Sequence, residues 1–157
     1  MLDIYDEFRR LIEVFDEQKV DYALCGGMAM AVHKRPRMTI DIDILIPPEF
    51  LERVIPLASE LGYNIRGKDL SFAYGAVEIR RVSKIDAASG DLLSLDFLLV
   101  TPQLQSVWAS RVISEWEGGT FTVVSRAGLI AMKQLRMSGQ DIDDIEALAE
   151  GGGDAEN

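Results

Sequence analysis

Two stretches of the sequence decide the fold: Asp21-Tyr22-Ala23-Leu24-Cys25-Gly26-Gly27 and Thr39-Ile40-Asp41-Ile42-Asp43-Ile44-Leu45-Ile46. The first is a short apolar run that stops at two glycines, which predicts a strand and a tight turn. A helix over 28–33 should follow, because Pro36 prevents it from continuing far. The second alternates β-branched residues with aspartates, which predicts a strand that ends at Pro47-Pro48. Together they predict strand, turn, helix and strand.

The rest of the chain continues this mixture of helices and strands. Apolar residues spaced three and four apart predict helices over 2–17, 49–61, 103–110 and 125–137, and a last one from Asp141. Strands are predicted over 63–66, 72–82, 92–100, 112–116 and 120–124, with turns at 87–91 and 118–119 closing two hairpins. We therefore expect one α/β (α+β) domain over residues 1–150, a mixed sheet flanked by helices, and a flexible acidic tail over 151–157.

Length and composition narrow the class of protein. The chain has 157 residues, 48% of them hydrophobic and 27% charged, which suits one globular domain. No apolar run approaches the roughly 20 residues of a membrane span, and acids stand where a secretory signal carries bases, so we expect a cytoplasmic protein without a membrane segment. A single Cys25 and a single His33 exclude a Cys/His zinc site. Any metal must therefore be held by oxygen ligands.

The net charge of −10 is unevenly placed along the chain. Residues 141–157 contain seven acids and no base, which leaves 19 acids and 16 bases, a charge of −3, for residues 1–140. A broad surface for nucleic-acid phosphates is therefore disfavoured. Two basic clusters, Lys34-Arg35-Arg37 and Arg80-Arg81-Lys84, are expected to be solvated surface.

Three aspartates predict a metal site. Asp41 and Asp43 point to the same face of their strand, with Cα atoms about 6.6–6.8 Å apart, while the isoleucines between them point into the core. Two neighbouring like charges raise each other's pKa unless a cation neutralises them. Asp96 is a lone carboxylate in another apolar strand, and the three acids converge if the two strands are neighbours. Such a set suits Mg²⁺ or Mn²⁺ and phosphoryl transfer, whereas the alternative is a sheet with one wet, acidic face.

The glycine turn adds a second element of the same chemistry. Gly26-Gly27 ends a strand and begins a helix, so bare backbone N–H groups face outward at the positive end of the helix dipole. Such a turn can cradle phosphate, although Gly-Gly alone is more often only a tight turn. Its position just before the acidic strand favours a nucleotide site.

These residues resemble a known family. Gly26-Gly27-Met28-Ala29 and the run Arg37-x-Thr39-x-Asp41-x-Asp43 look like the signature of the DNA polymerase β-type nucleotidyltransferase superfamily. The resemblance extends over about 21–148 and is strongest to AbiEii-like and minimal nucleotidyltransferases of toxin–antitoxin and phage-defence systems. It implies that Gly26 and Gly27 bind nucleotide phosphates and that Asp41, Asp43 and Asp96 are the catalytic, metal-binding carboxylates.

The resemblance also implies a reaction and its partners. Lys133 takes the place of a lysine thought to help bind the nucleotide, whereas Gln140 stands where a lysine is common. Arg37 is expected either at phosphate or paired with a strand acid, and Thr39 binds nucleotide only if its hydroxyl faces the site. The implied activity is Mg²⁺-dependent transfer of a nucleoside monophosphate from ATP or another NTP to a hydroxyl of a protein, a tRNA or a small molecule. A cognate toxin or antitoxin is a candidate partner, and the oligomeric state stays open.

Other interpretations of the motif are weaker. Only forty residues precede Asp41, fewer than a sugar-nucleotide glycosyltransferase places before its Asp-x-Asp, and the strand continues after Asp43, unlike in aspartyl phosphatases and calcium loops. The serious alternative is a nucleotidyltransferase-shaped protein that binds a partner without turnover. Cys25 and His33 are interpreted as a buried strand-end residue and a helix C-terminal residue.

Overall fold

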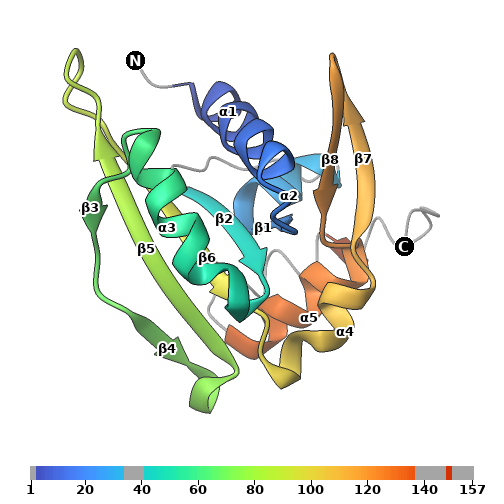
Figure 1. Cartoon of the computed structure of the whole chain (residues 1–157). Helices are drawn as coiled ribbons and strands as arrows, with labels where there is room; N and C mark the ends of the chain where they lie inside the picture. The colour runs from blue at the N-terminus through green and yellow to red at the C-terminus, as the bar shows by residue number, and fades with distance from the viewer. Residues whose placement is uncertain (1–2, 34–40, 137–147, 150–157) are drawn as a thin grey trace.

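A mixed β-sheet forms the centre of the computed structural model, which describes residues 3–33, 41–136 and 148–149 (Figure 1). The strands are β1 (Ala23–Cys25), β2 (Asp41–Ile46), β3 (Ile65–Arg66), β4 (Leu70–Phe72), β5 (Val77–Ile85), β6 (Leu92–Leu99), β7 (Val112–Trp116) and β8 (Gly119–Val123). Their order across the sheet is β3-β5-β6-β2-β1-β8-β7, and β4 also pairs with β5. Strand β2 runs parallel to β6, and β1 to β8, while the other pairs are antiparallel. The predicted mixed sheet is confirmed.

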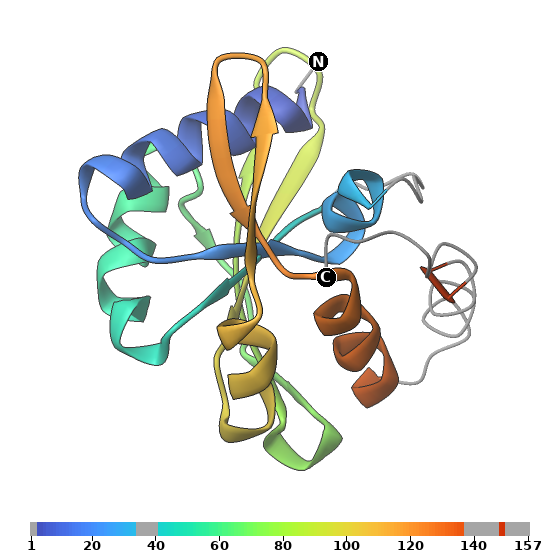
Figure 2. The ribbon, with the colours of Figure 1, turned by 90° about the vertical axis from the view of Figure 1, so that its right-hand side faces the viewer.

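Helices cover both faces of this sheet. They are α1 (Ile4–Glu17), α2 (Gly26–Val32), α3 (Leu51–Glu60), α4 (Gln105–Ala109) and α5 (Arg126–Arg136), with short 3-10 turns η1 (Pro48–Phe50), η2 (Ala73–Gly75) and η3 (Pro102–Leu104). Seen along the sheet, α1 and α3 lie on one side and α2 and α5 on the other (Figure 2). Within the described ranges, no helix combines the length and the apolar character needed to cross a membrane.

Helix α1 packs on one face of the sheet, against the β7–β8 hairpin. Asp3 caps the helix by accepting a hydrogen bond from the backbone N–H of Tyr5 at 2.9 Å. Phe8 is buried and meets the rings of Trp116 and Phe121 edge-on, with centroids 5.6 and 5.7 Å away. Ring contacts of this kind add to the burial of apolar surface, so the helix is fixed against the β7–β8 hairpin.

The region before β5 differs from the prediction. A single strand over 72–82 is wrong, because the chain turns at Ala73, Tyr74 and Gly75, which have φ angles of 53°, 54° and 88°. Strand β4 ends before this turn and β5 runs back beside it. The sequence gives little warning, since alanine and tyrosine rarely adopt the left-handed conformation that a tight turn requires.

Most other elements lie where the sequence places them. Helix α2 begins at Gly26, two residues before the predicted start. The predicted cap of α5 is confirmed, because the N–H of Gly128 donates to the Ser125 hydroxyl at 3.0 Å. The predicted helix from Asp141 lies outside the described residues except at 148–149, and the predicted tail over 151–157 lies wholly outside them.

Candidate active site

The pairing of β2 with β6 brings three aspartates to one face of the sheet. Asp41 and Asp43 alternate on β2 with Ile42 and Ile44, which are fully buried on the opposite face. In the parallel register Asp43 lies directly opposite Asp96, so these two carboxylates emerge on the same side. The condition under which the three acids were expected to converge, that their two strands are neighbours, is therefore met. We call Asp41, Asp43 and Asp96 the acidic face.

Gly26 lies directly against this acidic face. Its φ of +69° lies in the left-handed region that favours glycine, and Cys25 before it is the register partner of Asp43. A Cβ atom at Gly26 would lie 1.9 Å from Asp43 Oδ2 and 2.8 Å from Asp43 Cβ, closer than van der Waals contact allows. Both the backbone conformation and the space therefore require glycine. The glycine turn and the acidic strand form one site.

Arg81 holds the third carboxylate from the neighbouring strand. It lies opposite Asp96 in the antiparallel β5–β6 pair, and its guanidinium donates from Nε to Oδ1 at 2.7 Å and from Nη2 to Oδ2 at 2.9 Å. The Asp96 side chain is only 6% exposed, whereas that of Arg81 is 38% exposed. Asp96 is thus a buried carboxylate with a cation at its solvent side.

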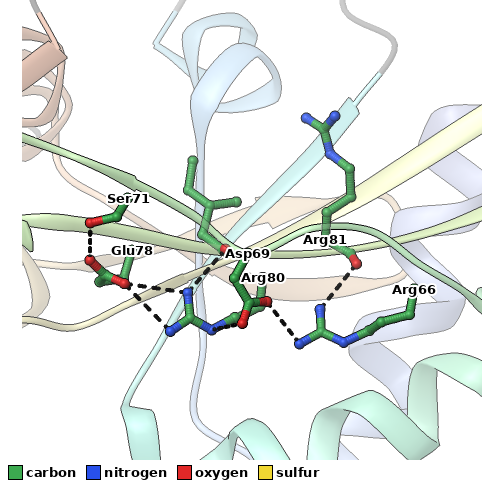
Figure 3. Close-up of polar contacts among 7 residues, drawn as sticks. Arg66, Asp69, Ser71, Glu78, Arg80 and Arg81 are labelled. Carbon is green, nitrogen blue, oxygen red and sulfur yellow. Dashed lines mark hydrogen bonds and ion pairs between the residues drawn. The ribbon is translucent and has the colours of Figure 1, made fainter.

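The expectation that Arg80-Arg81-Lys84 is solvated surface is wrong. Alternate residues of a strand point to opposite faces, so the cluster is divided. Arg80 pairs with Asp69 at 3.5 Å and Glu78 at 3.4 Å, and Figure 3 shows the Arg81 side chain directed away from this network. Lys84 pairs with Glu7 of α1. Each cation has an acidic partner in the fold.

The electrostatics of the acidic face favour a bound cation. Burial raises the pKa of Asp41, and the negative charge of Asp96 raises it further, while Arg81 lowers it in part. The pKa of Arg81 is raised above its ordinary value, chiefly by its hydrogen bonds to Asp96 and also by the charges of all three aspartates. One guanidinium therefore offsets the repulsion among these carboxylates only in part.

These donors fit a hard divalent cation by chemistry and placement. Carboxylate oxygens are the ligands that Mg²⁺ and Mn²⁺ prefer, and Asp41 and Asp43 share a strand face beside Asp96. In the part of the chain that the structure describes, no three His, Cys, Asp or Glu side chains are already gathered as a metal site. Both oxygens of Asp96 are instead engaged by Arg81. Ligation by all three would make a cation share the Asp96 carboxylate with Arg81.

The remaining predicted site residues are less directly placed. Gly27 is the buried second residue of α2. Lys133 lies in α5 and is 3% exposed. The nucleotide-binding roles of both residues stay predictions. Arg37 and Thr39 lie outside the described residues.

Cys25 and His33 have the structural places predicted for them. Cys25 is completely buried at the end of β1. His33 ends α2, where its Nε2 lies 2.9 Å from the carbonyl oxygen of Val124 and its own carbonyl accepts from Arg126 at 3.4 Å. The helix that begins at the glycine turn is thereby tied to the start of α5.

Arg81 is the site residue that the sequence interpretation missed, although a signal for it existed. In the structure the loop over 86–91, one residue longer than the predicted turn over 87–91, sets Ile85 opposite Leu92. Counting four residues along each strand from that pair places Arg81 opposite Asp96. Register from the turn was therefore more informative than the clustering of basic residues.

Comparison with protein families identifies the chain. The model for the nucleotidyl transferase AbiEii toxin of type IV toxin–antitoxin systems matches residues 8–157. This protein belongs to the AbiEii nucleotidyltransferase family. Its membership agrees with the resemblance seen in the glycine turn and the Asp-x-Asp strand, and the AbiEii-family chain is accordingly a nucleotidyltransferase. A search of curated proteins finds no match.

Solved structures similar to this AbiEii-family chain are also nucleotidyltransferases. The lincomycin-bound lincosamide antibiotic adenylyltransferase LnuA has a TM-score of 0.57 and 20% identity, over 92% of this chain and 95% of that one. A putative nucleotidyltransferase from Thermotoga maritima has a TM-score of 0.64 and 15% identity, over 96% and 92%. ANT(2")-Ia in complex with adenylyl-2"-tobramycin has a TM-score of 0.62 and 14% identity, over 93% and 87%. At these identities the similarity establishes the fold.

Proposed function

We propose that this nucleotidyltransferase transfers a nucleoside monophosphate from ATP to a hydroxyl group, using Mg²⁺ or Mn²⁺ held at the acidic face. The β2–β6 register supports this most strongly, because it sets Asp96 opposite Asp43. The backbone of Gly26 lies directly beside the Asp43 carboxylate. Phosphate-binding backbone and metal-binding carboxylates are then immediate neighbours. ATP is the nucleotide that the family resemblance favours over other NTPs.

The residues would divide the work in the following way. A bound divalent cation supplies Lewis-acid stabilisation of phosphate charge and lowers the pKa of the acceptor hydroxyl. Asp41 and Asp43 would hold it at the triphosphate, and Asp96 would serve the acceptor side. Gly26 and Gly27 would donate backbone N–H groups of the first helical turn to phosphate oxygens, since those groups lack partners within the helix. Lys133, Arg37 and Thr39 are assigned to the nucleotide by family resemblance.

The transfer forms one bond and breaks one. The acceptor oxygen bonds to the α-phosphorus, while the bond from that phosphorus to the oxygen bridging the β-phosphate breaks. Pyrophosphate leaves, and the hydroxyl proton passes to solvent. The chain contributes by positioning the two reactants and offsetting negative charge, which are the main sources of catalysis in phosphoryl transfer.

We propose a macromolecule of the cytoplasm, a protein or a tRNA, as the acceptor. The family model names a toxin of a toxin–antitoxin system, which supports a cellular macromolecule as target and a cognate antitoxin as partner. A small-molecule acceptor is the second candidate, because two structurally similar proteins carry lincomycin and adenylylated tobramycin.

A labelling experiment tests this function. The protein is incubated with α-labelled ATP, Mg²⁺ and a cell lysate that includes the product of the neighbouring gene, and in parallel with lincomycin or tobramycin. We expect label in an acceptor and release of pyrophosphate. Asp43→Asn should lower transfer about 1,000-fold or more, since it removes a metal ligand worth several kcal/mol in the transition state.

The matched control is Asp69→Asn, the same change at an aspartate whose side chain is 56% exposed and paired with Arg66 and Arg80. It should retain transfer within about twofold, as surface pairs contribute little. Label that never leaves ATP in any of these mixtures would instead favour a protein that binds a partner without turnover.

A further inference from the structure

The ion pair between Arg81 and Asp96 combines two good hydrogen bonds with an arginine that is partly exposed to solvent. Its two parallel hydrogen bonds, at 2.7 and 2.9 Å, are the fork geometry that gives arginine–carboxylate pairs their strength. Asp96 is buried, but more than a third of the Arg81 side chain is exposed. The guanidinium therefore borders solvent, whereas the carboxylate that it binds lies within the fold.

The neighbouring edge of the sheet supports Arg81 in this position. The Arg81 carbonyl accepts from the Gly67 N–H at 2.9 Å and from the Arg66 guanidinium at 3.2 Å. Gly67 leaves room for the arginine stem, because a Cβ there would lie 3.2 Å from Arg81 Cβ and 3.3 Å from its Cγ. Hydrogen bonds thus hold the Arg81 backbone, and Gly67 leaves space beside the stem that carries the guanidinium to Asp96.

A divalent cation and this guanidinium compete for the same carboxylate. Both oxygens of Asp96 accept hydrogen bonds from Arg81. Asp96 also lies opposite Asp43 in the β2–β6 pair. A metal ion sharing Asp96 would be brought close to a positive charge, and like charges repel strongly where water is partly excluded. A cation that gains Asp96 therefore displaces Arg81 at least in part.

We propose that Arg81 is a positioning residue that serves as the internal counter-cation of Asp96 and yields this carboxylate when a divalent cation binds. Arg81 then sets the cation concentration at which the site fills. It also limits repulsion among the aspartates while no metal is bound. This inference rests on the proposed metal-dependent function and adds to it a residue outside the glycine turn and the acidic face.

Direct titration with Mn²⁺ alone, without nucleotide, tests the role of Arg81. Electron paramagnetic resonance measures free Mn²⁺ against the whole chain, and thermal melting in metal-free buffer confirms that each variant folds. Arg81→Gln removes the competing cation, so we expect it to bind Mn²⁺ about tenfold more tightly than the parent. A role confined to strand pairing would lower the melting temperature and leave the Mn²⁺ affinity unchanged.

Arg80→Gln is the matched control. It removes the same unit charge one residue away, from a side chain that faces Asp69 and Glu78 rather than the acidic face (Figure 3). Its Mn²⁺ affinity should stay within about twofold of the parent, because a screened charge on the other face acts weakly. Arg81→Lys keeps the charge without the fork and should bind Mn²⁺ with intermediate affinity, which also provides the test if Arg81→Gln does not fold.

Two outcomes overturn the inference: Arg81→Gln that binds Mn²⁺ no more tightly than the parent, or Arg80→Gln that tightens binding equally. Asp43→Asn separates this failure from failure of the proposed function. If Asp43→Asn binds Mn²⁺ as the parent does, the cation lies elsewhere and the proposed metal site is wrong. If Asp43→Asn loses binding while Arg81→Gln matches the parent, only the role of Arg81 is refuted.

Discussion

Two polar clusters of this molecule join charged groups from distant parts of the chain, and they differ in what they leave open. In the first, Glu7 of α1 accepts from the Tyr63 hydroxyl at 2.9 Å and pairs with Lys84, whose ammonium also lies 4.9 Å from the Tyr63 ring centroid and 3.3 Å from the Leu61 carbonyl. We call Glu7, Tyr63 and Lys84 the helix clamp. One acid meets several donors, so its charge is satisfied within the fold.

The acidic face has the opposite balance. Its three aspartates share the charge of one guanidinium, that of Arg81, and burial together with the charge of Asp96 raises the pKa of Asp41 despite this cation. Such an arrangement lowers the stability of the metal-free protein. The comparison suggests that the helix clamp serves stability and the acidic face serves a ligand, and substitutions in each can test this.

After Asp43→Asn, the largest expected effect in this comparison comes from Gly26→Ala. The new Cβ would overlap Asp43, including its Cβ, which cannot rotate away, so the acidic face must shift. We expect transfer to fall about 100-fold, as a displacement of about 1 Å costs in well-positioned sites, and stability to fall by about 3 kcal/mol. Initial rates with labelled ATP and denaturant titration measure the two effects.

Gly90→Ala is the control for Gly26→Ala. Gly90 also has a positive φ, +77°, but nothing lies within 4 Å of its Cβ position. It should lose only about 1 kcal/mol from left-handed strain and keep full transfer. Equal behaviour of the two variants would show that contact with Asp43 is irrelevant.

The next effect concerns the helix clamp, where stability and activity should separate. Glu7→Gln leaves Lys84 with a weakened partner in a site where its side chain is only 12% exposed. Stability should fall by about 2 kcal/mol, which lowers Tm by roughly 4–8 °C, while transfer well below Tm stays unchanged. Glu13→Gln, the same change at an exposed position of α1, should leave Tm within about 1 °C. A loss of transfer in folded Glu7→Gln would break the division of roles.

The smallest effect is a pH-dependent gain of stability in Asp41→Asn. Because the pKa of Asp41 is raised in the folded protein, folding favours its protonated form. The parent therefore loses stability from this group as pH rises above about 4, the ordinary value, through the raised one. Without metal, Asp41→Asn should melt slightly above the parent at pH 7 and lose this advantage near pH 3. A lower Tm than the parent at pH 7, measured by scanning calorimetry, would contradict it.

The parts of the fold that were predictable carry strong local signals. The alternation in β2, the apolar stripe of α1 and the glycine turns each depend on residues adjacent in sequence. The turn before β5 was missed because Ala73 and Tyr74 adopt a conformation that their side chains disfavour. The acidic face could be predicted from the sequence, because the family resemblance connects Asp96 with Asp41 and Asp43, more than fifty residues earlier.

Residue pairs between strands, or between distant elements, were harder to predict from the sequence. Glu7 and Tyr63 lie 56 residues apart, and no local pattern links them. Arg81 was obscured by its basic neighbours, because a cluster of charges in sequence becomes two opposite faces in a strand. Pairings set by tertiary packing require the structure, whereas that of Arg81 follows once the hairpin register is known.

The central claim, that the acidic face is the cation site of the enzyme, is tested most directly by thermal melting of the parent and Asp43→Asn in Mg²⁺. Cations that bind the folded state relieve repulsion among the three aspartates and raise Tm. We predict that saturating Mg²⁺ raises the Tm of the parent and leaves that of folded Asp43→Asn unchanged. An equal rise in both proteins would place the cation elsewhere and contradict the account.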